Sequence, residues 1–372
     1  MVNKLLIYIN YFYPGINSGG PAKSISNLIN LIHKKIDVLI VTKNYDFKSK
    51  LTYNLPTNRL LTYKSKAKII YSSKKFSFQT LKKTEIGFNN VFLCGFFEPY
   101  TFKTLFKLIF INPTKKYFIL PMGVFSKIHI RQKRLKKRLY TFIFNLFKLY
   151  NKITFVFTSK EELNNASHHI KTIPNYIFLP DIPTKSFNVK FKKNKTPSVV
   201  FISRIHPLKN LDFTIDILNK LKKSVNFDIY GPIEDKKYWE ECLLKLKKTK
   251  NILNWKYKGV AYKNVGKIFS DYDLFIFPTK GENFGHVIFE AMSNGCIPVI
   301  SDRTPWSKAF ENTLDFTCDL FDEKCFVKKI DDLLFDFSKI QNLKKIYVSA
   351  AKKFYKKTYG IDYINKLQKA LL

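Results

Sequence analysis

The sequence predicts an α/β protein with two doubly wound parallel-sheet domains that face each other across a cleft. Three observations lead to this fold class. The chain has 372 residues, enough for about two domains of roughly 100–200 residues each. Short apolar runs alternate with helical periodicities, which is typical of a parallel sheet covered by helices on both faces. Between residues 174 and 197, prolines and lysines replace any regular period and indicate a connecting segment.

Residues 1–180 are assigned to the N-terminal domain. Its expected strands are buried apolar runs, and its first helix has apolar residues at three- and four-residue spacing. The strands are expected at 5–10, 37–42, 90–93, 117–120 and 153–158, and the first helix at 22–32. Residues 43–88 are expected to hold short strands and a helix near 78–83. A basic helix is expected before the last strand.

Residues 181–197 are assigned to a linker and residues 198–352 to the second domain. Its strands are expected at 198–203, 226–230, 252–257, 274–277 and 297–300, and its helices at 211–222, 237–248, 264–270 and 286–294. Residues 353–372 are expected to form a C-terminal helix that packs back on the N-terminal domain. Ligands of such folds bind at the carboxyl ends of the strands.

The composition argues against several classes of protein. No apolar run reaches ~18 residues, so no membrane-spanning helix is expected, and the apolar start at 5–9 indicates a first strand rather than a signal peptide. Five cysteines, at positions 94, 242, 296, 318 and 325, are scattered without a CxxC pair. Neither a disulfide scaffold nor a zinc ribbon is therefore expected, and the spacing fits a reduced, cytosolic compartment.

The charge is strongly positive and unevenly distributed. The chain has 65 Lys and Arg against 28 Asp and Glu, a formal charge of +37, and residues 1–190 hold 32 of the basic but only 7 of the acidic side chains. No acidic residue occurs between Glu98 and Glu161, where a basic run at 127–138 is followed by an aromatic run at 139–150. This combination suits an anionic membrane surface, so we expect residues 127–152 to contact the inner membrane.

Two alternatives to membrane contact stay open. The segment could be a helix with a solvated basic face and an apolar face in the core, and a Lys-, Phe-, Ile- and Asn-rich composition also fits mutational drift. Nucleic acid is not an expected partner, because only six of the 65 basic residues are Arg and no nucleic-acid-binding motif accompanies them.

The motif at 277–295 carries the clearest chemistry. An apolar strand ends at Pro278, a polar loop carries Glu282, and a helix begins near Gly285 and contains Glu290. The backbone N–H groups of 284–287 should point out of this helix N-terminus, which favours phosphate, and glycine permits its close approach. Two carboxylates beside a phosphate site suit a sugar nucleotide. The alternative is an acidic residue that favours the helix dipole and a solvated glutamate.

Two further motifs lie at strand ends. Arg204 and Lys209 follow the strand at 198–203, where two cations can neutralise a leaving diphosphate; the alternative is a basic loop in a basic protein. Gly19 and Gly20 follow the first strand, where glycines allow a tight turn near an anion. The pattern is not GxGxxG, so it does not indicate dinucleotide binding.

Together these motifs resemble family 4 of the retaining glycosyltransferases, the glycosyl transferases group 1 set, which has the two-Rossmann GT-B fold. The resemblance covers nearly the whole chain, is most specific at Glu282 and Glu290, and is to members that build surface polysaccharides. It implies that Glu290 binds the donor ribose and that Glu282, Arg204 and Lys209 form the catalytic set. Glu282 would contact the transferred sugar, and the two cations would hold the leaving diphosphate.

The resemblance also implies further donor contacts and the course of the reaction. The donor-binding positions are Phe284, Gly285, His286 and Val287 around the phosphate and sugar, Gly259 and Val260 near the base, and Gly20 from the other domain. No metal or other cofactor is implied, because cationic side chains replace it in the family. The acceptor would attack the face that the phosphate leaves, and the phosphate would take the acceptor proton, so no protein nucleophile is assigned. The pair Asp271 and Asp273 is interpreted as structural.

On the acceptor side, residues 120–124 resemble a Pro-Arg-Gly stretch of the family, with Met122 in place of the arginine and Gly123 after it. An anionic acceptor group would then be held by Lys127 or Arg131. The resemblance implies a cytoplasmic enzyme, peripheral on the inner face of the membrane, that moves a sugar from a nucleotide-diphosphate sugar to a lipid-linked glycan of lipopolysaccharide or another surface polysaccharide. The alternative is a non-catalytic protein that binds membranes or polyanions on the same scaffold.

Overall fold

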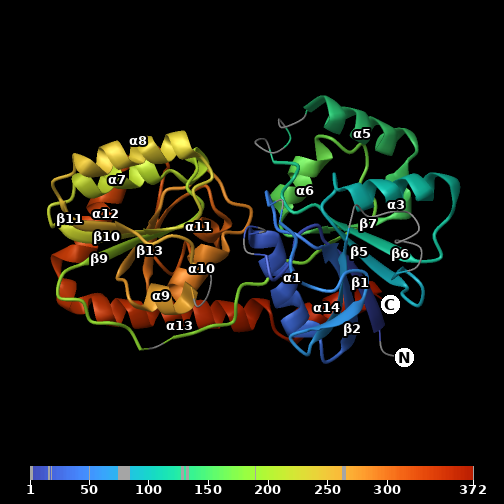
Figure 1. Cartoon of the computed structure of the whole chain (residues 1–372). Helices are drawn as coiled ribbons and strands as arrows, with labels where there is room; N and C mark the ends of the chain where they lie inside the picture. Colours follow the sequence, from blue (N-terminus) through green and yellow to red (C-terminus); the bar gives the residue numbers. More distant parts are fainter. Residues whose placement is uncertain are drawn as a thin grey trace. The chain divides into compact units, whose positions relative to one another are not determined.

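The computed structural model describes residues 3–15, 17, 19–49, 51–73, 84–126, 130, 134–188, 190–261 and 265–371 (Figure 1). The contacts between residues divide the chain into two compact units. Unit 1 comprises Met1–Ile182 and Tyr359–Leu372, and unit 2 comprises Pro183–Thr358. Each unit is an α/β layer structure with a largely parallel sheet, which confirms the predicted fold class. The structure has no helix that is both long and apolar enough to cross a membrane, within the residues it describes.

Unit 1 is built on an eight-stranded sheet with the order β3-β4-β2-β1-β5-β6-β7-β8. The strands are β1 (Asn3–Tyr8), β2 (Ile36–Lys43), β3 (Leu60–Tyr63), β4 (Ala67–Ser72), β5 (Asn90–Cys94), β6 (Lys116–Leu120), β7 (Thr154–Phe157) and β8 (Tyr176–Phe178). Only β3 runs antiparallel to its neighbour. The central strands are apolar and buried along their length, as strands covered on both faces must be.

Helices of unit 1 bury their apolar faces against this sheet. They are α1 (Gly19–Ile32), α3 (Pro99–Phe110), α5 (Arg134–Leu146), α6 (Lys160–Ser167) and α14 (Ile361–Leu371), with the 3-10 turn η1 (Leu149–Lys152). The core between α3, α5 and the sheet is aromatic: Phe96 lies 5.0 Å, centroid to centroid, from Phe125, Tyr140 and Phe144. The helix predicted at 78–83 lies outside the described residues.

Unit 2 has a six-stranded, fully parallel sheet with the order β11-β10-β9-β12-β13-β14. The strands are β9 (Ser198–Ile202), β10 (Val225–Tyr230), β11 (Ile252–Tyr257), β12 (Leu274–Phe277), β13 (Ile297–Ser301) and β14 (Thr317–Cys318). Numbered from β9, this is the order 3-2-1-4-5-6 of a doubly wound nucleotide-binding sheet. The strand order reverses between β9 and β12, so this sheet has its topological switch point there.

The unit 2 helices cover both faces of the sheet (Figure 1). They are α7 (Leu211–Asn219), α8 (Lys236–Lys247), α9 (Val265–Ser270), α10 (His286–Ser293), α11 (Pro305–Ala309), α12 (Glu323–Phe335) and α13 (Ile340–Thr358), with the 3-10 turns η2 (Pro207–Lys209) and η3 (Phe337–Lys339). The helices α7, α8 and α12 pack together, as do α9, α10 and α13. The helices and strands predicted from periodicity within the described residues are found with their ends shifted by at most three residues.

Two segments differ from the predicted domain limits. The linker is assigned to residues 181–197, and of these the described residues from 183 onward belong to unit 2, where the amides of Asn188 and Lys192 donate to the carbonyls of Ser293 and Ser270. The C-terminal residues form two helices rather than one, because α13 ends at Thr358 and α14 begins at Ile361. The Tyr363 hydroxyl on α14 donates to the carbonyl of Pro180 within unit 1.

A buried ion pair fixes α13 to the unit 2 sheet. Lys344 Nζ lies 2.7 Å from Asp273 Oδ1, and both side chains are fully buried. The amide and hydroxyl of Ser198 donate to the other oxygen of Asp273, and Lys344 also donates to the carbonyl of Tyr272. Because the charges are paired and hydrogen-bonded, their burial is tolerated. The contacts of Asp273 agree with the structural interpretation of the pair at 271 and 273.

Two of the five cysteines form a disulfide that the sequence analysis did not identify. Cys318 and Cys325 form a disulfide, with their Cα atoms 5.8 Å apart, within the usual range for such a bridge. Their separation of seven residues gave no CxxC signal, but Cys318 ends β14 and Cys325 lies in the first turn of α12, so a short loop folds them together. Cys94, Cys242 and Cys296 are free and buried.

Candidate functional site

Polar side chains gather at the switch point of the unit 2 sheet. Arg204 and Lys209 follow β9, and Glu282 follows β12. These two strands are hydrogen-bonded neighbours in the sheet, so the loops after them emerge side by side at its carboxyl edge. This edge is where doubly wound sheets bind their ligands.

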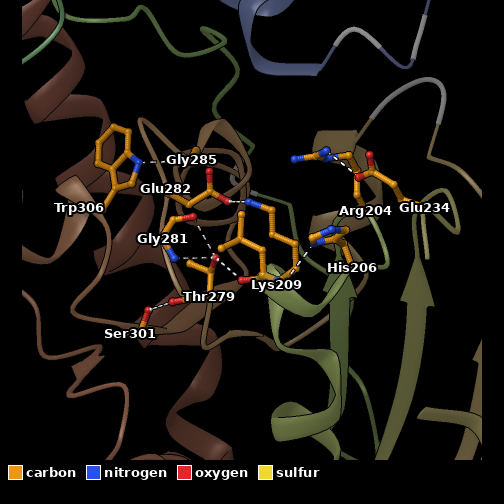
Figure 2. A network of polar contacts seen from close by, with 11 residues as sticks. Arg204, His206, Lys209, Glu234, Thr279, Gly281, Glu282, Gly285, Ser301 and Trp306 are labelled. Atoms are coloured by element: carbon orange, nitrogen blue, oxygen red, sulfur yellow. Dashed lines mark hydrogen bonds and ion pairs between the residues drawn. The ribbon is translucent and has the colours of Figure 1, made fainter. Parts of the chain in front are cut away.

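Lys209 and Glu282 form an ion pair across this point (Figure 2). Lys209 Nζ donates to Glu282 Oε1, and the two side chains are only 8% and 16% exposed. The ammonium group also lies 5.7 Å from the centroid of the Phe277 ring. A cation and a carboxylate of low exposure interact more strongly than a surface pair. Together they offer an anion-binding and a hydroxyl-binding group at one place.

Short hydrogen-bonded loops hold this pair in position. The amide of Lys280 donates to the carbonyl of Leu208, which joins the loop after β12 to η2. The Thr279 hydroxyl donates to the same carbonyl, and the Ser301 hydroxyl of β13 donates to the carbonyl of Thr279 (Figure 2). The amide of Glu282 donates to the carbonyl of Arg303. The backbone at the site is therefore tied to three neighbouring strands.

Arg204 is paired with a residue that sequence reasoning did not select. Its Nη1 lies 2.6 Å from Glu234 Oε2, and the guanidinium is about half exposed (Figure 2). Glu234 comes after Gly231, whose φ is +142° and whose hypothetical Cβ would lie 1.7 Å from the carbonyl oxygen of Ser203. Only glycine fits so close to another backbone. The Gly231 amide donates to the carbonyl of Gly259, which joins the loop after β10 to the loop after β11.

The N-terminus of α10 opens at the same edge. Gly285 has φ +76° and caps the helix, and His286 is its first residue. Trp306 Nε1 donates to the Gly285 carbonyl over 3.1 Å (Figure 2). The Trp306 ring lies 4.9 Å from that of Phe284. The Phe284 ring packs edge-on against the buried His286 ring at 4.7 Å. The Ile288 amide in this first turn donates to the Gly285 carbonyl, and the N-terminus of a helix, here the backbone from Gly285 to Val287, favours an anion.

Glu290 lies in the second turn of α10 with a side chain that is almost fully buried. The hydroxyl of Thr184 donates to its Oε1 over 3.0 Å. Thr184 belongs to the segment assigned to a linker, and this contact makes the segment part of the site. Val260 follows Gly259 after β11 and is half-buried.

The side chains at this edge of the unit 2 sheet could bind an anion that carries hydroxyl groups. Two cations and a helix N-terminus supply positive potential, and Glu282 and Glu290 supply hydroxyl acceptors. Within the described ranges, no cluster of three or more His, Cys, Asp and Glu side chains is placed to hold a metal ion.

Residues 183–354, almost all of unit 2, match the model of the family described as "Glycosyl transferases group 1". Unit 2 therefore has the sequence pattern of this family over almost its whole length. The resemblance drawn from the motifs is thereby confirmed. The motifs with Arg204, Lys209, Glu282 and Glu290 lie within the matched residues, whereas Gly19 and Gly20 lie outside them.

Solved structures show that the GT-B fold extends over the whole chain. Sucrose-phosphate synthase from Thermosynechococcus elongatus is 13% identical, with a TM-score of 0.76 and 99% of both chains covered. Anabaena HepE in complex with UDP-glucose is 14% identical, with a TM-score of 0.69 and 98% and 97% covered. WaaG, a glycosyltransferase involved in lipopolysaccharide biosynthesis, is 12% identical, with a TM-score of 0.63 and 99% and 98% covered.

A curated relative matches over a shorter stretch. The GtfA subunit of the UDP-N-acetylglucosamine–peptide N-acetylglucosaminyltransferase of Streptococcus agalactiae is 26% identical over 131 residues, which is 34% of this chain. The match spans 25% of that relative's length.

The acceptor-side residues that the structure describes lie in unit 1. Met122 and Gly123 follow β6 with φ of +57° and +76°, and the Gly123 amide donates to the buried Glu162 carboxylate over 2.6 Å. Gly20 is the second residue of α1. Lys127 and Arg131 lie outside the described residues. The segment 127–152 is described only from residue 134 onward, apart from residue 130.

Met122 also lines a small cavity of about 30 Å³ in unit 1, together with Thr158 and Asp181. Burial raises the pKa of the Asp181 carboxyl to about 7; a hydrogen bond from the Ser24 hydroxyl opposes this, and the charge of Glu162 adds to it. Burial likewise raises the pKa of Glu162, against the hydrogen bonds that it accepts from the amides of Thr158 and Gly123.

Proposed function

We propose that this chain is a glycosyltransferase that moves a sugar from a nucleotide-diphosphate sugar to a glycan acceptor. The observation that carries the proposal is the Lys209–Glu282 pair beside the N-terminus of α10, at the switch point of a unit that has the sequence pattern of the glycosyl transferases group 1 family. The UDP-glucose complex of the structurally similar HepE and the UDP-sugar named for the GtfA relative support this class of donor.

In this proposal the cations neutralise the diphosphate. Lys209 and Arg204 exchange their carboxylate partners for phosphate oxygens and stabilise the negative charge that builds up as the diphosphate leaves. No metal ion is needed, because the two side chains and the α10 amides supply the positive potential. Glu282, released from Lys209, accepts hydroxyls of the transferred sugar.

The remaining donor contacts in this proposal are those that the family resemblance implies. Glu290 accepts the ribose hydroxyls, which would compete with the Thr184 hydroxyl that it now binds. The backbone from Phe284 to Val287 holds the phosphate and sugar, and Gly259 and Val260 lie near the base. Gly20 of unit 1 approaches the phosphates.

We propose that the reaction retains the anomeric configuration. The bond between the anomeric carbon and the phosphate oxygen breaks first, which leaves an oxocarbenium-like ion beside the diphosphate. The acceptor hydroxyl oxygen then bonds to the same face of this carbon. Its proton passes to the leaving phosphate oxygen, so atoms and charges balance without a protein nucleophile.

The acceptor in this proposal is a lipid-linked glycan of a surface polysaccharide or lipopolysaccharide, met at the cytoplasmic face of the membrane. The likeness to WaaG supports this pathway class. Unit 1 provides the acceptor side through Met122 and Gly123, with Lys127 and Arg131 as its anion-binding residues, and it contacts anionic lipid through residues 127–152.

Nucleotide binding measured by thermal shift tests the donor site. UDP, GDP, dTDP and CMP are each added to the wild type and to Glu290→Ala. A ligand at 100 times its dissociation constant stabilises the protein by ~2.7 kcal/mol. We expect one nucleotide, with UDP the first candidate, to stabilise the wild type and to have a much smaller effect on the variant.

If no nucleotide shifts a cooperatively unfolding sample, the donor site is refuted. The chain would then be a non-catalytic protein that binds membranes or polyanions on a GT-B scaffold. Turnover of the stabilising nucleotide's sugar on a membrane extract, with the anomeric configuration of the product read by NMR, tests the reaction itself. Activity that persists in EDTA is expected.

A further inference from the structure

Helix α3 of unit 1 exposes a row of phenylalanines. Phe102, Phe106 and Phe110 are spaced four residues apart, which places them on one face of the helix. Their rings contact one another in sequence, with centroids 6.3 and 5.4 Å apart. Phe110 is 73% exposed, whereas Leu105 and Leu108 on the opposite face are buried. The helix therefore has a second apolar face that the protein core does not use.

Helix α5 has the same construction. Leu135, Leu139, Phe142 and Leu146 are 61–81% exposed. At 3.6 residues per turn they fall within about 60° of arc, directly opposite the core residue Phe144. Two separate helices of one unit thus bury one apolar face and present another to solvent.

The two rows are carried by neighbouring helices and are here together called the α3–α5 surface, which is defined by those seven side chains. The rings of Phe102 on α3 and Tyr140 on α5 lie 5.7 Å apart. Lys152 Nζ in η1, just after α5, donates to the carbonyls of Leu108 and Ile111 at the end of α3. Figure 1 shows α3 and α5 as neighbouring helices at one side of unit 1. Exposed apolar side chains that gather on adjacent helices and are bordered by polar residues mark interaction sites.

The charges around this surface are positive. Arg134, Lys136 and Arg138 are exposed and lie on either side of the apolar row of α5. The sequence has no acidic residue from 99 to 160 to balance them. Other lysines nearby are used internally: Lys137 lies over the Phe97 ring at 5.0 Å, and Lys107 lies 3.5 Å from Glu85.

We infer that the α3–α5 surface docks on an anionic lipid bilayer, with its apolar rows inserted among the acyl chains and its basic residues at the headgroups. The inference extends the membrane contact proposed above from residues 127–152 to α3, and it does not require the donor site to be correct. The positive charge around the α3–α5 surface indicates which partner binds it. A second copy of the chain would bring like charges together, whereas an anionic headgroup layer complements them.

The inference is tested by sedimentation with vesicles. The full chain is mixed with vesicles of phosphatidylcholine alone or with one third phosphatidylglycerol, and the bound fraction gives a partition coefficient. We expect binding to the anionic vesicles and at least about tenfold weaker binding to the neutral ones, because each basic side chain at an anionic surface contributes about a fivefold factor.

Three variants separate the contributions. Phe106→Ser with Phe142→Ser removes one ring from each row and should lower the partition coefficient at least about tenfold. Arg134→Glu with Arg138→Glu should abolish the preference for anionic vesicles. Phe335→Ser is the matched control, because Phe335 is 83% exposed on α12 in unit 2, and it should bind as the wild type does. Unchanged melting temperatures and nucleotide shifts show that the variants are folded and that the donor site is separate.

A fluorescent label on Leu139→Cys reports contact directly. The native free cysteines are all buried, so the label reacts at position 139. Its emission should shift to the blue on anionic vesicles, and a label on Phe335→Cys should not respond.

Wild-type binding by both surface double variants would overturn the inference, as would equal binding to neutral vesicles. Self-association that the Phe106→Ser, Phe142→Ser variant abolishes, without vesicle binding by the wild type, would assign the surface to a second copy instead.

Discussion

Lys209 and Glu282 are joined in an ion pair across the point at which the strand order of the unit 2 sheet reverses. Both side chains are largely shielded from water. The Glu282 carboxylate is therefore bound to Lys209, the cation that binds the diphosphate in the proposed mechanism. Binding of the donor must replace one anionic partner of Lys209 with another, and the same exchange releases Glu282 to accept sugar hydroxyls. This coupling makes the pair the most informative place for mutation.

Replacing Lys209 with methionine should weaken nucleotide-diphosphate binding about 10- to 100-fold, the usual range for losing a charged hydrogen bond. Glu282→Gln should bind the nucleotide diphosphate at least as tightly as the wild type, because it no longer competes for Lys209, while sugar transfer falls. Calorimetric titration with the stabilising nucleotide measures both effects. Lys280→Met, an exposed neighbour, is the control. Equal binding by Lys209→Met and the wild type would remove Lys209 from the donor site.

Glu234 should restrain Arg204 in the empty site. Their pair is about half exposed on the arginine side, so it contributes at most about 1 kcal/mol. Glu234→Gln should therefore lower the dissociation constant of the nucleotide diphosphate by up to about fivefold, most clearly at low salt, where exposed charges are screened least. Glu240→Gln on α8 removes an equivalent exposed charge and should leave the constant unchanged. Weaker binding by Glu234→Gln would instead indicate that Glu234 positions Arg204 for the phosphate.

The close approach of Gly231 to Ser203 should make unit 2 intolerant of any side chain there. A Cβ would lie 1.7 Å from the Ser203 carbonyl oxygen, and φ of +142° is a region that other residues rarely adopt. Gly231→Ala should cost at least about 3 kcal/mol, or roughly 6–12 °C in the melting temperature of a unit of this size. Gly281→Ala, where a Cβ meets open space, should be nearly neutral. Differential scanning calorimetry compares the two variants, and equal melting temperatures would contradict so close an approach of the two backbones.

The features that the sequence predicted correctly depend on residues close together in the chain. Periodicity was enough to find the alternating strands and helices, and spacing was enough to find the motif with Glu282 and Glu290. The partner of Arg204 was not found, because Glu234 reaches it only where Gly231 lets the loops after β9 and β10 touch. A glycine directly after a predicted strand, followed by an acidic residue, was the available signal.

Contacts between distant segments also explain the other omissions. Thr184 lies in a proline-rich stretch with no periodicity, yet it binds Glu290, 106 residues away. The phenylalanine row of α3 has the four-residue spacing of an ordinary core face, and only the packing of Leu105 and Leu108 shows that the core lies on the other side. Cys318 and Cys325 are brought together by the turn between β14 and α12.

The stability of unit 1 should fall as the pH rises, because of Asp181. Burial raises the pKa of this carboxyl to about 7, whereas an unfolded aspartate has a pKa near 3.9. Between these values the folded state holds more protons than the unfolded state, so the free energy of unfolding decreases from about pH 4 to about pH 7 and then levels off. Asp181→Asn keeps the size of the side chain and removes its titratable group.

Urea unfolding at pH 5 and pH 8 measures the effect. The wild type should lose about 1–3 kcal/mol between the two conditions, at up to 1.36 kcal/mol per pH unit for one group, and Asp181→Asn should lose distinctly less. Asp37→Asn, an exposed aspartate of β2, should follow the wild type. Because burial raises the pKa of Glu162 as well, some decline should persist in Asp181→Asn. A variant whose decline equals that of the wild type would show that Asp181 is ionised in the folded protein across this range.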